Sequence, residues 1–469
     1  MIKLNEFTFF IVLLGIFFMP FNSFEGIEFL GEFKRDSCIL FFLLAALFVI
    51  NKKKLELPVN NMLFQVFILV ILYFFLTGIL NFYDLSNYYF KKTSGLSRFA
   101  RQYTSLILSS LFLIGLFYNV FKNYDTTVVF YKIRKVLTYS LYVVAVYAVF
   151  ELFIVKFNMV QLLDILRVFD YFPFTEVRID TTSNRLSSVT FESPALATYL
   201  LSISGWMFSY VLTDKKLSRF FPILLTIVLS FLSGSRAGIF IIIIQIMVFL
   251  AYIIKDKKFH KLFARIFSVG AVLVFFALLF FANPIYEYAL SKISSFKTSD
   301  DVHAISNKSR FGIQVALFEV FLENPIKGTG YGLQAYESKD LYPEWAVKDN
   351  WEFKYKYLNE NHKSFPPGYN LYVRLLAETG IIGFSLFMFF ILLILLWCFN
   401  KAFKKQGSET IIPIVIAISM VGFLLNWFKS DTFRIYFFWL CLTLIIMLQK
   451  EEKKKNYEEK ISSPNSALQ

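Results

Sequence analysis

Long apolar stretches separated by short polar connections run through nearly the whole chain. Each stretch is close to the roughly 20 residues that an α-helix needs to cross a bilayer. The sequence therefore predicts an all-α polytopic membrane protein of about twelve transmembrane helices. The predicted spans are 5–24, 34–50, 62–80, 104–121, 136–155, 194–212, 220–234, 237–254, 264–282, 370–399, 410–427 and 432–449.

Two connections are longer than the others, one near 156–193 and one at 283–369. The larger one contains a helical pattern from Ser309 to Leu322, and this helix should end before Pro325 because a residue preceding proline disfavours helix. Spans and loops divide the chain into four parts: nine helices in 1–282, an outer loop at 283–369, three helices in 370–449 and a charged, disordered tail at 450–469.

Lysine and arginine gather on every second connection between the predicted spans. Short cytoplasmic connections of membrane proteins collect these residues. The alternation predicts that both termini lie in the cytoplasm and that the two long loops lie outside. The basic groups are Lys52–Lys54, Lys132/Arg134/Lys135, Lys215/Lys216/Arg219, Lys255/Lys257/Lys258/Lys261/Arg265, Lys401/Lys404/Lys405 and Lys453–Lys455.

Composition narrows the class of protein further. Of 469 residues, 57% are hydrophobic, which is more apolar surface than a soluble protein can bury. The net charge of +14 follows the predicted topology, so we expect no nucleic-acid partner. Cys38, Cys398 and Cys441 lie in apolar stretches and indicate neither a disulfide framework nor a zinc site. The N-terminal stretch lacks a small-residue cleavage site, so we expect a retained helix.

Arg236 lies in the sequence FLSGSRAGIF, between two apolar runs joined only by residues 234–236. A cation there is costly unless it lies at the membrane interface or faces a polar cavity. Two interpretations remain open. Arg236 either anchors a short outer hairpin, or it binds an anion beside small neighbours that let a large headgroup approach.

Three more polar residues lie near the predicted outer face, and two of them have two interpretations each. Arg310 begins the loop helix and fits an ordinary surface arginine as well as an anion ligand. Glu192 precedes Ser193 and Pro194, a pattern typical of helix capping, but its position also fits substrate binding. Arg185 precedes the same span.

Arg374 and Glu378 are four residues apart just inside the tenth span, which fits a helix-face ion pair or a cavity-facing pair. His362 lies seven residues before that span and is a candidate catalytic base, although a solvated or structural role fits as well. The sequence contains no Ser-His-Asp spacing, phosphate-binding loop or HExxH motif. Its acidic residues lack a specific metal-ligand spacing, so we expect neither a metal nor a cofactor.

Three sequence blocks follow one another in the second half of the chain: SGSRAGIF at 233–240, SRFGIQVALFEVFLENPIKGTGYG at 309–332, and YNLYVRLLAETGIIG at 369–383. Together they resemble the O-antigen ligase/polymerase superfamily of membrane glycosyltransferases. In the third block Asn370, Gly380 and Gly383 fit the ligase pattern, whereas Tyr369 occupies the position of the ligase histidine.

The resemblance implies a GT-C-like, metal-independent, inverting glycosyltransferase that uses an undecaprenyl-diphosphate-linked glycan. Arginines suit a diphosphate leaving group because their planar fork matches phosphate oxygens. Aromatic residues of the large loop would either stack on sugars or form a small loop core. The candidate residues are Arg236, Arg310 and Arg185 for the diphosphate, Glu192, Asn370, Arg374 and Tyr331 for the glycan, and His362, Tyr369 and Glu378 for catalysis.

The leading hypothesis is a repeat-unit polymerase of O-antigen or another surface polysaccharide, acting outside the bacterial inner membrane on a lipid-linked acceptor. Its partners would be the lipid-linked glycan, membrane lipid and a chain-length regulator. The alternatives are an O-antigen ligase that transfers glycan to lipid A core or protein, and a lipid-linked glycan flippase. A flippase is disfavoured because the ionisable residues gather at one face instead of lining the spans through the bilayer midplane.

Overall fold

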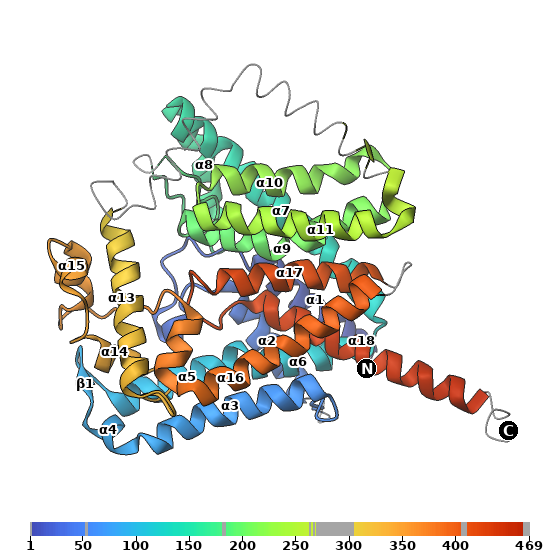
Figure 1. Ribbon diagram of the computed structural model, residues 1–469. Coiled ribbons are helices and arrows are strands. Elements are labelled where there is room, and N and C mark those ends of the chain that lie inside the picture. The colour runs from blue at the N-terminus through green and yellow to red at the C-terminus, as the bar shows by residue number, and fades with distance from the viewer. Residues whose placement is uncertain are drawn as a thin grey trace.

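The computed structural model describes residues 2–51, 55–180, 184–261, 264–265, 268, 304–404 and 410–462. In this part of the chain nearly every element is a helix (Figure 1). The first elements are α1 (Ile2–Phe18), η1 (Glu28–Phe33), α2 (Ser37–Asn51), α3 (Met62–Leu80), α4 (Phe82–Asn87), the antiparallel strands β1 (Tyr89–Phe90) and β2 (Thr93–Ser94), α5 (Gly95–Ser109), α6 (Leu111–Phe121), α7 (Thr126–Phe157), η2 (Val160–Leu162), α8 (Leu163–Leu166) and η3 (Arg167–Tyr171).

The second half of the chain continues the helical architecture. The predicted span at 264–282 lies outside the described residues, apart from 264, 265 and 268. The elements are α9 (Ser193–Thr213), η4 (Leu217–Phe220), α10 (Phe221–Leu232), α11 (Arg236–Lys255), η5 (Lys257–Phe259), α13 (Ala304–Glu323), α14 (Gln334–Ser338), α15 (Glu344–Val347), η6 (Glu352–Tyr357), α16 (Leu371–Phe399), η7 (Asn400–Lys404), α17 (Ile411–Asn426) and α18 (Tyr436–Ser462).

Six helical segments in the described residues are long and apolar enough to cross a membrane, and four more are apolar but shorter. The all-α membrane fold is therefore supported, while the total of twelve spans stays a prediction. The six segments are Met62–Leu80, Gly95–Phe121, Thr126–Phe157, Ser193–Thr213, Arg236–Lys255 and Leu371–Phe403. The tail is helical as far as Ser462, so the predicted disorder is wrong for residues 450–462.

Successive long helices alternate in direction, which gives the bundle two distinct ends. At one end Leu371 N donates to Trp427 O at 2.9 Å, which joins the start of α16 to the end of α17. At the other end the Asn61 side chain donates to Gln449 at 2.6 Å, which joins the start of α3 to α18. We call the end that carries residues 304–370 the loop end, and the other the basic end.

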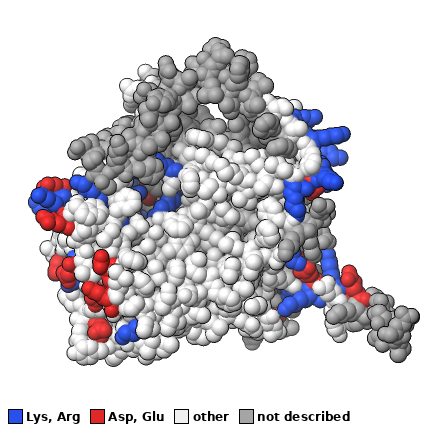
Figure 2. All heavy atoms as spheres, viewed as in Figure 1, with Lys and Arg blue, Asp and Glu red and all other residues white. Residues whose placement is uncertain are grey.

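Charged side chains gather at these two ends, with a largely uncharged surface between them (Figure 2). Apolar residues of α3 such as Leu69, Leu72 and Ile79 are exposed on this middle surface, as expected for helices that face lipid. In contrast, α9 and α17 pack against each other and are buried along most of their length. The loop-end termini of these two central helices hold part of the cavity described below.

The described part of the large predicted loop, residues 304–369, is folded. Its helix α13 begins at Ala304, ends at Glu323 just before Pro325, and crosses the direction of α16 (Figure 1). A small core joins α13 to α15, η6 and α16 through Ile313, Leu317, Val320, Ala346, Phe353, Tyr357 and Ala377. Among the loop aromatics, Tyr331, Tyr336 and Tyr357 are buried, which fits a loop core, whereas Trp345, Trp351 and Tyr355 are exposed. Stacking of the exposed rings on sugars stays a prediction.

The turn after α13 packs directly on a break in α16. Thr329 N donates to Ala377 O at 3.0 Å and Gly330 N to Glu378 O at 2.9 Å. In the other direction, Ile381 N donates to Pro325 O at 2.8 Å. These bonds are possible because Gly380 leaves the helical conformation, with φ of 62° and ψ of −171°. The second and third sequence blocks thus form one structural unit.

Candidate functional site

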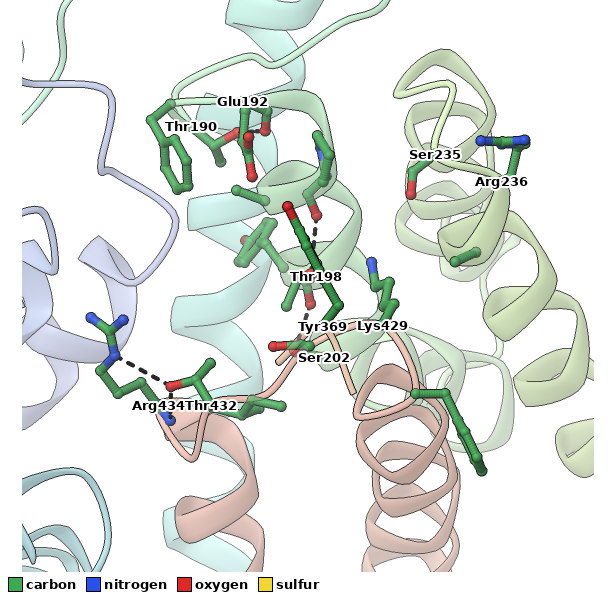
Figure 3. Close-up of a pocket in the computed structure, with 18 of the residues that line it drawn as sticks. Thr190, Glu192, Thr198, Ser202, Ser235, Arg236, Tyr369, Lys429, Thr432 and Arg434 are labelled. Atoms are coloured by element: carbon green, nitrogen blue, oxygen red, sulfur yellow. Dashed lines mark hydrogen bonds between the residues drawn. The ribbon is translucent and has the colours of Figure 1, made fainter. Parts of the chain in front are cut away.

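A cavity of about 750 Å³ opens at the loop end, where α9, the turn before α11, α13, the start of α16 and the α17–α18 loop meet. Figure 3 shows part of its lining, including Glu192, Arg236 and Lys429. Its lining carries five cationic and two acidic side chains from these elements and the segments beside them. They are Arg185, Arg236, Arg310, Lys429 and Arg434, with Asp36 and Glu192. The excess of positive charge fits a ligand with several negative charges.

Arg236 is the first residue of α11. Gly234 makes the sharp turn from α10 possible because its φ is 63°, a conformation that favours glycine. Ser235 caps the new helix by accepting from Gly238 N at 3.3 Å. The Arg236 guanidinium donates to Asn307 of α13 at 3.4 Å. The small residues thus place an arginine and a helix N-terminus at the cavity wall, which is a favourable arrangement for an anion.

Arg310 lies on α13, and its guanidinium is 5.4 Å from the centre of the Tyr369 ring. The Tyr369 hydroxyl is hydrogen-bonded to the Tyr357 hydroxyl. Burial raises the pKa of the Tyr369 phenol, so Tyr369 is protonated at neutral pH. Asn370 also lines the cavity, and its side chain caps α16 by accepting from Tyr372 N at 3.0 Å.

Glu192 occupies the N-cap position of α9, but its side chain makes no capping hydrogen bond. The predicted capping role is therefore not performed by its carboxylate. That carboxylate is exposed to the cavity, while burial by the surrounding protein raises its pKa. The positive charges of Arg310 and Lys429 act in the opposite direction and favour the ionised form.

The loop between α17 and α18 supplies two cations that the sequence analysis did not select. The Nζ atom of Lys429 is buried and has no hydrogen-bond partner among the residues that the structure describes. Burial and the nearby charge of Arg310 lower the pKa of Lys429 to about 8. Arg434 donates to Thr432 Oγ1 at 3.3 Å and lies 3.5 Å from the Asp36 carboxylate. The signal in the sequence was the polar segment KSDTFR between two apolar spans.

Four of the predicted site residues do not line the cavity. Arg374 and Glu378 form a buried ion pair at 2.9 Å, and Arg374 also donates to Asp431 O at 2.7 Å. This pair therefore joins α16 to the loop that carries Lys429. The other two are Tyr331, which is buried and stacked on Phe74, and His362, which lies in the partly exposed segment before α16.

The cavity thus brings together Arg185, Glu192, Arg236, Arg310, Tyr369 and Asn370 of the residues predicted from the sequence. They come from segments separated by up to 185 positions, which only the fold places side by side. No group of three histidine, cysteine, aspartate or glutamate side chains that could hold a metal occurs among the residues that the structure describes.

Residues 221–388 match the family model of the O-antigen ligases. This range contains all three sequence blocks, so the resemblance inferred from them is confirmed. It includes Arg236, Arg310 and Tyr369, whereas Glu192 and Lys429 lie on either side of it. No curated protein matches the chain.

Proposed function

We propose that this chain, whose residues 221–388 match the family model of the O-antigen ligases, is a repeat-unit polymerase of a bacterial surface polysaccharide. It transfers a growing glycan from an undecaprenyl diphosphate carrier to a second lipid-linked glycan. The observation that carries this proposal is the cationic cavity at the loop end of a membrane helix bundle.

The chemistry of the transfer fits this cavity. A bond forms between the acceptor hydroxyl oxygen and the anomeric carbon of the donor. The bond from that carbon to the phosphate oxygen breaks, and the carrier diphosphate leaves with the electron pair. Negative charge therefore grows on the diphosphate, where Arg236 and Arg310 stabilise it, with Arg185 and Lys429 nearby. Attack from the face opposite the leaving group inverts the anomeric configuration.

A ligase is the second candidate, since the matching family model is that of the O-antigen ligases. The polymerase is favoured because Tyr369 stands where ligases of this superfamily carry a histidine. Its phenol is held by Tyr357 and Arg310, and its raised pKa makes it a poor base. The acceptor must then be activated in another way than in those ligases.

The deciding experiment is reconstitution of the purified protein in liposomes with a lipid-diphosphate-linked repeat unit. We expect a ladder of longer glycans that remain attached to the lipid carrier, together with released undecaprenyl diphosphate. Transfer only to added lipid A core would favour the ligase instead. Because arginines act on the diphosphate, EDTA should leave the rate unchanged, and restoration by Mg²⁺ after a loss would contradict metal independence.

We further propose that the loop end faces outward and that both termini are cytoplasmic. Lys348→Cys, at the loop end, should react with a membrane-impermeant maleimide in intact cells, and Lys216→Cys should not. Both positions are exposed, and all three native cysteines are buried, so background labelling should be low. Labelling of Lys216→Cys alone would reverse the proposed orientation.

Donor binding should weaken with rising pH because Lys429 loses its charge. The pKa of Lys429 is lowered to about 8, so its cation is present below pH 8 and is lost above it. If the diphosphate requires the charged form, KM for the donor should rise about tenfold between pH 7 and pH 9. Lys429→Arg remains charged throughout this range and should abolish the rise. An equally steep pH dependence in Lys429→Arg would exclude Lys429 as its source.

A further inference from the structure

We propose that Glu192 is the general base that removes the proton from the acceptor hydroxyl. This inference rests on the proposed glycosyl transfer, and it assigns the residue that replaces the histidine of the related ligases. In the proposed step the Glu192 carboxylate takes the hydroxyl proton as the oxygen attacks the anomeric carbon. The carrier diphosphate leaves with the electron pair, and Glu192 later releases its proton to water.

The base must reach the cavity and have an oxygen or nitrogen able to accept a proton. Of the catalytic candidates from the sequence, His362 and Glu378 do not line the cavity. Glu378 is fully buried against Arg374. Tyr369 does line it, but its raised pKa and its bond to Tyr357 keep the phenol protonated. None of the three side chains both reaches the cavity and carries a free basic group.

Two carboxylates line the cavity, and only one of them is available to accept a proton from a substrate. Asp36 accepts a hydrogen bond from the Tyr436 hydroxyl at 2.7 Å and lies 3.5 Å from the guanidinium of Arg434. These contacts hold Asp36 as a partner of two side chains from the α17–α18 loop and α18. For Glu192, by contrast, no hydrogen bond from the described residues reaches the carboxylate, not even from the helix that it precedes.

The segment that carries Glu192 is held firmly in place. The carboxylate of Glu151, on α7, accepts from Ser188 N at 2.7 Å. Asn22 N donates to Val189 O at 3.2 Å. The backbone oxygen of Glu192 accepts from Thr190 Oγ1 at 2.8 Å. The backbone is therefore fixed while the side chain is free to meet a substrate, which is the arrangement that acid–base catalysis requires.

The charges around Glu192 suit a base. Burial raises the pKa of Glu192, which makes the carboxylate more basic than in water. Arg310, Lys429, Lys356 and Arg35 oppose this effect and keep it ionised. Arg310 and Lys429 also line the cavity, where they would hold the diphosphate. The acceptor hydroxyl would thus lie between the carboxylate and the donor bound by these cations.

The test compares wild type, Glu192→Gln, Glu192→Ala and the control Glu344→Gln, an exposed glutamate of the 304–369 segment that lies outside the cavity. Each is reconstituted with the lipid-linked donor and acceptor, and donor binding is measured separately by titration. We expect Glu192→Gln to lower the rate of transfer by about a hundredfold to ten-thousandfold while donor affinity changes less than threefold. Glu344→Gln should behave as wild type.

Azide separates a catalytic role from a structural one because it is a nucleophile that needs no deprotonation. With Glu192→Ala it should attack the anomeric carbon and yield a glycosyl azide of inverted configuration, with release of the carrier diphosphate. A Glu192→Gln rate above one tenth of wild type, or no azide product from a Glu192→Ala protein that binds donor, would overturn the assignment. A wild-type protein that releases no carrier diphosphate contradicts the proposed function and this inference together.

Discussion

Replacing Gly380 with alanine is expected to abolish correctly folded protein in the membrane. Gly380 has φ of 62° and ψ of −171°, a region essentially restricted to glycine. A Cβ atom there would lie 2.2 Å from the backbone oxygen of Ile326. Backbone cannot yield as a flexible side chain does, so the turn must leave α16 and lose the bonds that join the two motifs. We expect a cost above about 4 kcal/mol.

The control for this substitution is Gly31→Ala. Gly31 also has a positive φ of 57°, but a Cβ atom there would meet nothing within 4 Å. Gly31→Ala should therefore show only the conformational cost of about 1–3 kcal/mol. Monodisperse yield and Tm in detergent measure both proteins. Equal yields and equal Tm for Gly31→Ala and Gly380→Ala would show that the contact with Ile326 contributes nothing.

The helical architecture was predictable because the length of an apolar stretch can be read directly from the sequence. The segments around α3, α9 and α11 were located to within a few residues, as was the helix that ends before Pro325. The docking of residues 325–330 on α16 was not predictable, because it depends on backbone hydrogen bonds between segments 50 positions apart. The sequence showed the glycines of this turn and of α16, but not the backbone atoms that they contact.

The candidate site could be predicted only in part, because the contacts between distant segments cannot be read from the sequence. Arg236 and Arg310 stood out because arginines next to glycines or at a helix start near an apolar span need a polar environment. Arg374 and Glu378 met the same criterion, and the structure shows that they form an ion pair with each other. Sequence spacing identified the pair but could not tell an ion pair facing the helix bundle from one facing a cavity.

Lys429 was missed because its segment, KSDTFR, resembles the other polar connections between apolar spans. Its significance comes from the nearby charges of Arg310 and Glu192, which are distant from it in the chain. Figure 3 shows Lys429, Glu192 and Tyr369 in the lining of one cavity. Asn370 was selected from the motif alone, and the structure adds that its side chain begins α16. Motif membership thus located the correct segment without revealing what the side chain does.

Replacing Arg310 with alanine is expected to lower kcat for glycan transfer about a hundredfold in protein of normal yield. Arg310 is exposed to the cavity, and its guanidinium faces the Tyr369 ring. A hydrogen bond to a charged group is worth roughly 1.5–3 kcal/mol, and an arginine can offer two to one diphosphate. Since charge grows on the diphosphate as it departs, the loss should fall on kcat more than on KM.

Arg310→Lys separates charge from geometry. Lysine preserves the positive charge but loses the planar fork, so we expect a loss of about tenfold, intermediate between wild type and Arg310→Ala. The matched control is Arg167→Ala, because Arg167 lies at the loop end outside the cavity and its side chain is 63% exposed. That substitution should change kcat less than twofold. Wild-type turnover by Arg310→Ala would show that Arg310 does not act in the site. Full activity of Arg310→Lys, with loss in Arg310→Ala, would show that only the positive charge is required and would exclude the bidentate contact.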